Sequence, residues 1–97
     1  MYAVSNQIAK QKFDKVQVEK LVKTNVLEIL NISLEKGATF PEHTSPTDAQ
    51  LIVLEGDIVF SINGDPNQLK AQQSFNFPKE TVHFVIANEN SKFLIVR

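Results

Sequence analysis

Residues 37–56 read Gly-Ala-Thr-Phe-Pro-Glu-His-Thr-Ser-Pro-Thr-Asp-Ala-Gln-Leu-Ile-Val-Leu-Glu-Gly. The stretch follows a strand-like run and passes through a proline-bounded loop that carries His43, one of only two histidines. It then enters a compact apolar run that ends at Glu55-Gly56. The other histidine, His83, lies near the far end of the chain behind Pro78. We expect any chemistry of this protein to lie where the two imidazoles meet.

The composition is that of one globular domain. The chain has 97 residues, of which 42% are hydrophobic and 22% charged, and a domain of this size buries roughly 60–70% of its extended surface. The net charge of −1 gives no electrostatic footprint for nucleic acid or an anionic membrane. The absence of cysteine excludes a disulfide framework, a thiolate nucleophile and a thiolate metal site.

The first residues show no targeting pattern. They lack a basic region followed by an apolar one, and no apolar run approaches the roughly 20 residues that span a bilayer. We therefore expect a soluble, cytoplasmic protein with neither a nucleic acid nor a membrane as partner. The sequence predicts a single domain over residues 1–97, with an N-terminal arm or strand over residues 1–15 and a barrel over residues 20–97.

Short strand-like runs recur about every 8–12 residues, with turn signals between them. Asn63-Gly64 is the strongest hairpin signal because both residues tolerate the positive φ of a type I′ turn. Pro66 then bars a central strand. The pattern predicts an all-β antiparallel sandwich or barrel. The expected strands cover residues 16–22, 26–34, 51–54, 57–62, 69–71, 74–77, 82–87 and 93–96.

Three residues of the opening stretch, Gly37, His43 and Gly56, match a known spacing. They resemble the first motif of the cupin superfamily, Gly-x5-His-x-His-x3–4-Glu-x6-Gly. In this chain Ser45 stands at the second histidine, and Ala49 stands at the glutamate with Gln50 beside it. The resemblance is to a branch of small single-domain cupins in which these two ligands are also missing.

The region around His83 resembles the second cupin motif, Gly-x5-Pro-x-Gly-x2-His-x3-Asn. Pro78 and His83 match it, whereas Gln72 and Glu80 replace its glycines and Ala87 replaces its asparagine. Together the two motifs imply a jelly-roll barrel, also described as a double-stranded β-helix. They do not imply one activity, since cupins include oxygenases, isomerases, storage proteins and sensors.

The full cupin pattern offers three histidines and a glutamate to an Fe, Mn, Ni, Cu or Zn ion. Only His43 and His83 remain as candidate metal ligands here, and two imidazoles without a carboxylate make a poor site for a divalent ion. Ser45 is too short to replace a histidine. Gln50 should point away from the face of Ala49 unless a bulge shifts the register. We therefore expect metal binding to be weak or absent.

The favoured function is binding of a small molecule in a pocket between the two histidines. The alternatives are a metal-dependent enzyme of oxygenase or isomerase type and a non-catalytic structural or interaction module. No catalytic residue is assigned, and Asp48 is interpreted as a residue that stabilises its own turn. The predicted pocket residues are His43, Ser45, Gln50, Leu51, Val53, His83 and Val85.

A homodimer is the expected assembly. His83, Val85 and Ala87 should share the inward face of their strand, which leaves Phe84 and Ile86 pointing outward. These large apolar side chains must be covered either by the second sheet and the N-terminal arm or by a second copy of the chain. The resemblance to small cupins also implies a dimer.

Overall fold

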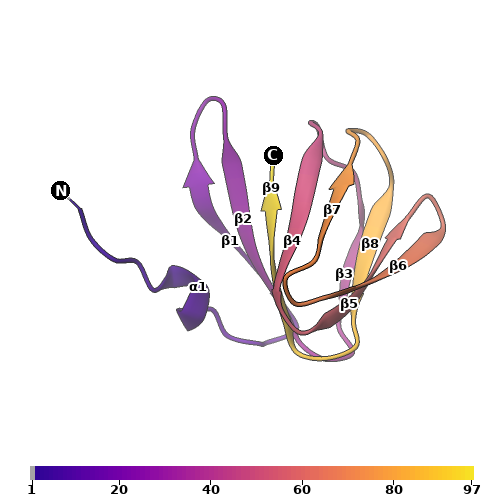
Figure 1. Cartoon of the computed structure of the whole chain (residues 1–97), viewed down its shortest axis with the longest axis horizontal. Helices are drawn as coiled ribbons and strands as arrows, with labels where there is room; N and C mark the ends of the chain where they lie inside the picture. The colour runs from indigo at the N-terminus through magenta and orange to yellow at the C-terminus, as the bar shows by residue number, and fades with distance from the viewer. Residues whose placement is uncertain (1) are drawn as a thin grey trace.

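The structure is a computed structural model that describes residues 2–97, and its elements are almost all β-strands (Figure 1). The helix in this range, α1 (Gln7–Lys10), is a single turn. The strands are β1 (Val16–Lys23), β2 (Glu28–Leu34), β3 (Thr39–His43), β4 (Ala49–Glu55), β5 (Asp57–Ile62), β6 (Asp65–Lys70), β7 (Ser74–Phe77), β8 (His83–Ala87) and β9 (Ser91–Val96).

The strands form two antiparallel sheets. One has five strands in the order β1-β2-β9-β4-β7, and the other has four in the order β3-β8-β5-β6. The sheets face each other around a shared core (Figure 1). This arrangement confirms the predicted all-β, jelly-roll fold. Within residues 2–97, no helix is long and apolar enough to cross a membrane.

The core forms because alternate residues of each strand point inward. In β4 the burial alternates so that Ala49, Leu51 and Val53 are buried and the residues between them are not. The largest side chains at the centre are Phe60 of β5 and Phe93 of β9, which come from opposite sheets. Burial of this apolar surface is the main stabilising contribution to the fold.

The predicted hairpin at Asn63-Gly64 is confirmed. Both residues have positive φ, 50° and 82°, and Ile62 pairs with Asp65 across the turn. The expected short segment at residues 69–71 was too narrow, because β6 begins at Asp65 and includes Pro66. A proline is tolerated there because β6 is the edge strand of its sheet and has one free side.

The N-terminal region contains a helical turn rather than a strand. It is held on the outer face of the five-stranded sheet by the buried Lys92, whose ammonium group donates to Ile8 O (2.6 Å) and Gln11 O (3.1 Å). The Gln11 amide donates to Asn31 O (2.9 Å) and accepts from Ser33 Oγ (2.6 Å). The N-terminal region therefore covers part of this face.

The position of the N-terminal region on the outer face determines which part of β2 is buried on both faces. Its first residues, Glu28 and Ile29, are only half-buried, and Val26 lies before the strand and is 91% exposed. The second half is buried instead, since the inward Ile32 and the outward Asn31 and Ser33 are all inaccessible. The outward Phe84 and Ile86 of β8 lie on the other sheet, so the arm does not cover them, and Ile86 is 37% exposed.

Candidate functional site

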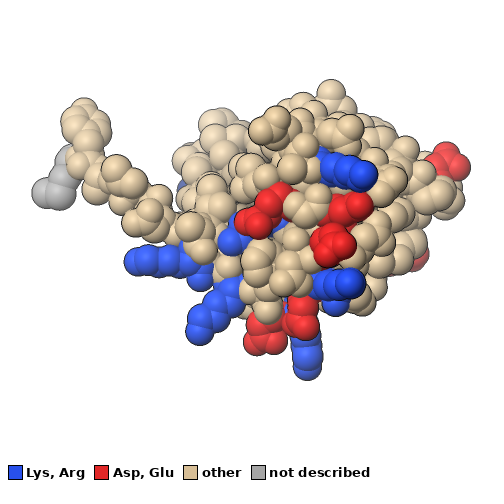
Figure 2. Space-filling view, turned by 60° about the horizontal axis from the view of Figure 1, so that its bottom comes forward, with Lys and Arg blue, Asp and Glu red and all other residues tan. Residues whose placement is uncertain are grey.

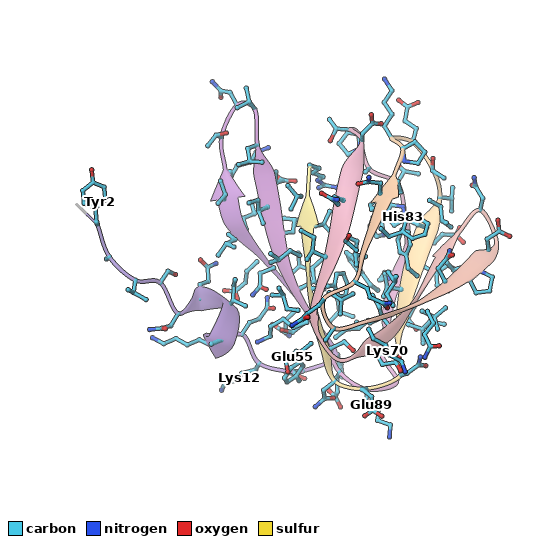
Figure 3. All side chains as sticks on the ribbon, viewed as in Figure 1. Tyr2, Lys12, Glu55, Lys70, His83 and Glu89 are labelled. Carbon is cyan, nitrogen blue, oxygen red and sulfur yellow. The ribbon has the colours of Figure 1, made fainter. Side chains whose placement is uncertain are left out.

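The two histidines meet at one end of the barrel. His43 ends β3, His83 begins β8, and the two residues are paired in the register of these strands. Their Nε2 atoms are 2.9 Å apart and their ring centroids are 4.1 Å apart. His83 is buried, with 1% of its surface exposed, whereas His43 is partly exposed. Figure 3 labels His83 in the region of β7 and β8.

A β-bulge aims His43 at this position. Phe40 pairs with Val85 and His43 pairs with His83, so two residues of β3 oppose the single Phe84 of β8. Residues three apart in a regular strand point to opposite faces. The extra residue turns both Phe40 and His43 to the same side, and their rings stand 4.5 Å apart.

The hydrogen bonds of the imidazoles determine where the protons lie. His43 Nδ1 is 2.7 Å from Pro41 O, and His83 Nδ1 is 2.8 Å from Thr81 O. A carbonyl oxygen only accepts, so each Nδ1 must carry the hydrogen. The Nε2–Nε2 hydrogen bond then requires one further proton. A hydrogen bond therefore joins the two Nε2 atoms only when one of the rings is protonated at both nitrogens.

Burial disfavours the charged form of His83. Desolvation lowers the pKa of His83 below its ordinary value, and the hydrogen bond to Thr81 O opposes this effect only in part. Coulombic repulsion from His43 and from Arg97 lowers the pKa of His83 further. The pair therefore consists of a buried His83, whose neutral form is favoured, and a more exposed His43.

Aromatic rings form the walls around the pair. The Phe77 ring lies 4.7 Å from the His83 ring, and the Phe60 ring lies 5.5 Å from it, both measured between centroids. Phe40 contacts His43 on the other side. These contacts could not be predicted from the sequence, because an inward phenylalanine at the site has the same pattern as a core residue. Pro41 was a sequence signal for the bulge, because a proline within a strand often occurs at a β-bulge.

The remaining predicted pocket residues do not all converge on the histidines. Ser45 is buried, and its hydroxyl donates to Thr47 O at 2.7 Å. Gln50 lies on the opposite side of β4 from Ala49 and Leu51, as its parity predicts, because the register of β4 is regular at this point. Gln50 is therefore turned away from the interior that holds the imidazoles.

Leu51, Val53 and Val85 belong to the packed hydrophobic core. They support the site from within the barrel. A cavity of about 370 Å³ lies nearby and is lined by Asp48, Ala49, Asn76, Phe77 and Pro78. Phe77 lines this cavity and also contacts His83, so one aromatic ring connects the cavity with the histidine pair.

Asp48 differs from its predicted role. Its Oδ1 accepts a hydrogen bond from the backbone N–H of Lys79 at 3.0 Å, so it stabilises the loop before β8 and not its own turn. Glu80 N donates to Ser45 O at 2.8 Å and adds a second link. These bonds fasten the loop that carries Thr81, the partner of His83.

The residues at this site do not fit a resident divalent metal. Within residues 2–97, no group of three or more His, Cys, Asp or Glu side chains is arranged to hold an ion. Ala49 offers no donor atom, Gln50 faces the other way, and the Ser45 hydroxyl is engaged with Thr47 O. Two imidazoles alone fall short of the three protein ligands that such sites usually supply.

The fold is shared by many solved structures. A conserved protein of unknown function from Streptococcus pyogenes is 28% identical, with 88% of this chain and 75% of that chain covered and a TM-score of 0.79. An RmlC-like cupin protein from Desulfovibrio desulfuricans is 21% identical, with 99% and 95% covered and a TM-score of 0.87. A cupin superfamily protein from Desulfitobacterium hafniense is 15% identical, with 99% and 90% covered and a TM-score of 0.85.

The family assignment comes from the sequence match. No curated protein matches the chain, but the family model described as Cupin domain matches residues 31–96. The matched region holds both histidines and all strands from β3 to β9. The chain is therefore a small member of the cupin family.

Proposed function

We propose that this protein binds a small organic molecule at the His43–His83 end of its barrel. The observation that carries the proposal is the position of the two Nε2 atoms, which face each other while both Nδ1 atoms are tied to backbone carbonyls. Small-molecule sites usually combine aromatic and apolar walls with a few convergent polar groups. The rings of Phe40, Phe60 and Phe77 around the imidazoles supply that combination.

The hydrogen-bonding groups favour an acceptor on the ligand. His43 is partly exposed, and its Nε2 atom is the nitrogen that could donate to a ligand in place of His83. Without a ligand, the Nε2 atom of His43 contacts Nε2 of His83. A ligand carboxylate could accept a hydrogen bond from His43 Nε2–H and so replace that contact. Small carboxylates are therefore the favoured class, ahead of neutral sugars and phenols.

The cavity beside Phe77 is large enough for a small ligand. Its volume of about 370 Å³ is within the range of roughly 300–1,000 Å³ that is typical of ligand pockets. Its Phe77 wall contacts His83, so a rotation of that ring would bring a ligand in the cavity into contact with the imidazole. In this proposal the Phe77 ring lies between the two histidines and the cavity until a ligand enters.

Thermal unfolding of the full chain with a panel of ligands tests the proposal. The panel contains benzoate, glucuronate, glucose and phenol. A ligand that binds the folded state raises the melting temperature progressively with its concentration. We expect a rise with one of the carboxylates and its loss in His43→Phe, which keeps an aromatic ring but has no ring nitrogen. Val26→Ala, a change at an exposed hairpin residue, is the control for stability.

The proposal is wrong if His43→Phe responds to the same ligands as the wild type, because binding then does not involve the imidazole. It is also wrong if no carboxylate, sugar or phenol shifts the transition at any concentration while the protein is folded.

The second candidate is a metal-dependent enzyme. The observation behind it is that both Nδ1 atoms are tied to backbone carbonyls, so the Nε2 atoms of neutral His43 and His83 would both offer lone pairs. Metal analysis of protein purified without a histidine tag tests this candidate, and His43→Ala is the matched variant. Stoichiometric metal that is lost in His43→Ala would support it. Metal that dialyses away, or that does not depend on His43, would remove it.

A further inference from the structure

The cavity beside Phe77 carries a carboxylate that the protein leaves unpaired. Asp48 is the charged residue of its lining, and the others are Ala49, Asn76, Phe77 and Pro78. Both ion pairs within residues 2–97 belong to Glu28, so neither neutralises Asp48. A hollow lined by one carboxylate and no basic side chain favours a positively charged group on a ligand.

This imbalance of charge is local to the cavity. On the face shown in Figure 2, acidic and basic side chains lie interspersed. The whole chain has 10 lysine and arginine residues against 11 aspartate and glutamate residues. No broad field of one sign therefore draws ions to the protein. Selection of a cation must come from direct contacts inside the cavity.

The backbone holds the Asp48 carboxylate in place. Its Oδ1 atom accepts a hydrogen bond from Lys79 N at 3.0 Å. Ser45 O accepts a second bond from Glu80 N at 2.8 Å, so two bonds join the loops before β4 and before β8. Asp48 is exposed, and no hydrogen bond among the described residues occupies its Oδ2 atom. An acceptor that is already fixed loses little conformational freedom when a ligand binds to it.

Two other residues of the lining suit an ammonium group. An ammonium has three donors and no acceptor, and the Asn76 side-chain oxygen, like Asp48 Oδ2, can accept one of these donors. The aromatic ring of Phe77 adds a second attraction, because a cation is attracted to the face of such a ring. A carboxylate, an amide oxygen and an aromatic ring together match a protonated primary amine.

We infer that Asp48 is a specificity-determining residue that selects, among small carboxylates, those that also carry a protonated amine. This inference rests on the proposed function, in which the carboxylate of the same ligand binds His43. Phe77 lines the cavity and also contacts His83, so a ligand that reaches from Asp48 to the imidazoles must pass this ring. The ligand class is therefore an amino carboxylate whose two charged groups are separated by an apolar spacer.

The variant Asp48→Asn separates the two roles of this residue. An asparagine oxygen can still accept the hydrogen bond from Lys79 N, so the link between the loops is kept. The charge is removed, and an NH₂ donor replaces the acceptor Oδ2. Asp65→Asn is the matched control, because Asp65 is exposed at the start of β6 and does not line the cavity.

Isothermal titration calorimetry of the full chain with three matched ligands tests the inference. 4-Methylbenzoate carries the carboxylate alone, benzylamine carries the amine alone, and 4-(aminomethyl)benzoate carries both groups. We expect 4-(aminomethyl)benzoate to bind about tenfold more tightly than 4-methylbenzoate, because its ammonium gains a charge-assisted hydrogen bond with Asp48. Asp48→Asn should remove this difference, and Asp65→Asn should keep it.

The three ligands distinguish failure of the inference from failure of the proposed function. If the two benzoates bind equally and both depend on His43, carboxylate binding stands and the role of Asp48 is wrong. If 4-methylbenzoate does not bind but benzylamine binds and loses affinity in Asp48→Asn, the proposed function fails and amine selection by Asp48 stands. A preference for the amine that survives in Asp48→Asn overturns the inference. Absence of binding by both amines also overturns it.

Discussion

His43 and His83 are paired across neighbouring antiparallel strands, with their Nε2 atoms 2.9 Å apart. Each ring is also fixed at Nδ1 by a carbonyl two residues before it in the chain, Pro41 O or Thr81 O. The two rings are therefore fixed in orientation by the backbone, and the buried His83 is favoured in its neutral form. The stability of the pair should depend on pH and on the backbone around it.

Stability should fall in mild acid because of His83. Burial lowers the pKa of this residue in the folded state below its ordinary value of 6.5, so the unfolded chain binds more protons just below that pH. The contribution of His83 is complete above pH 6.5 and is lost as the pH falls through the lower folded-state pKa. Urea unfolding between pH 4 and 8 measures it, and His83→Gln should flatten the slope in this window. An unchanged slope would show that another group is responsible.

Gly56→Ala should destabilise the protein strongly. Gly56 has a φ of 97°, and a Cβ atom there would lie 2.6 Å from Asn90 O and close to Ser91 Oγ. The left-handed backbone costs about 1–2 kcal/mol for a non-glycine residue, and the overpacking adds about 1–3 kcal/mol.

Gly37→Ala is the matched control for this change. Gly37 also has a positive φ, 84°, but a Cβ atom there would meet nothing within 4 Å. Denaturant unfolding should show only the backbone cost of about 1–2 kcal/mol. Equal losses at the two positions would contradict the packing argument for Gly56.

Asn31→Leu should stabilise the protein. The Asn31 side chain is fully buried beneath the N-terminal region, and neither Oδ1 nor Nδ2 has a hydrogen-bond partner among the described residues. A buried polar group without a partner costs about 1–3 kcal/mol. We expect a gain of about 1 kcal/mol in the free energy of unfolding. Ser33→Ala is the contrasting variant, since it removes the bond to Gln11 and should destabilise.

Gln72→Gly should be neutral or slightly stabilising. Gln72 has a φ of 71°, and Glu80 has a φ of 60°. Both occupy positions where the second cupin motif has glycine, so the backbone keeps the left-handed conformation although the side chain has changed. Glycine relieves about 1–2 kcal/mol of strain and costs about 0.5–1 kcal/mol of chain entropy. A clear loss in thermal unfolding would mean that the glutamine side chain contributes contacts of its own.

The all-β fold could be predicted from the sequence, because its turns and strands recur at a regular spacing. The parity of neighbouring residues predicted that Gln50 points away from the face of Ala49, and Asn63-Gly64 predicted its hairpin, because these signals depend on neighbours along the chain. The motif spacing also predicted that His43 and His83 meet. These properties are local, or they repeat at a fixed interval, so they can be read without coordinates.

Tertiary structure decided how the site and the N-terminal region are built. The bulge at Pro41-Glu42 turns His43 inward, and the carbonyls of Pro41 and Thr81 set the tautomer of each ring. Lys92 holds Ile8 and Gln11 from a strand more than 80 residues away, which buries Asn31 and Ser33. Residues 1–12 have no hydrophobic period in the sequence. Long-range hydrogen bonds from Lys92, Lys20, Asn31 and Ser33, which a local pattern does not show, guide the N-terminal region across the sheet.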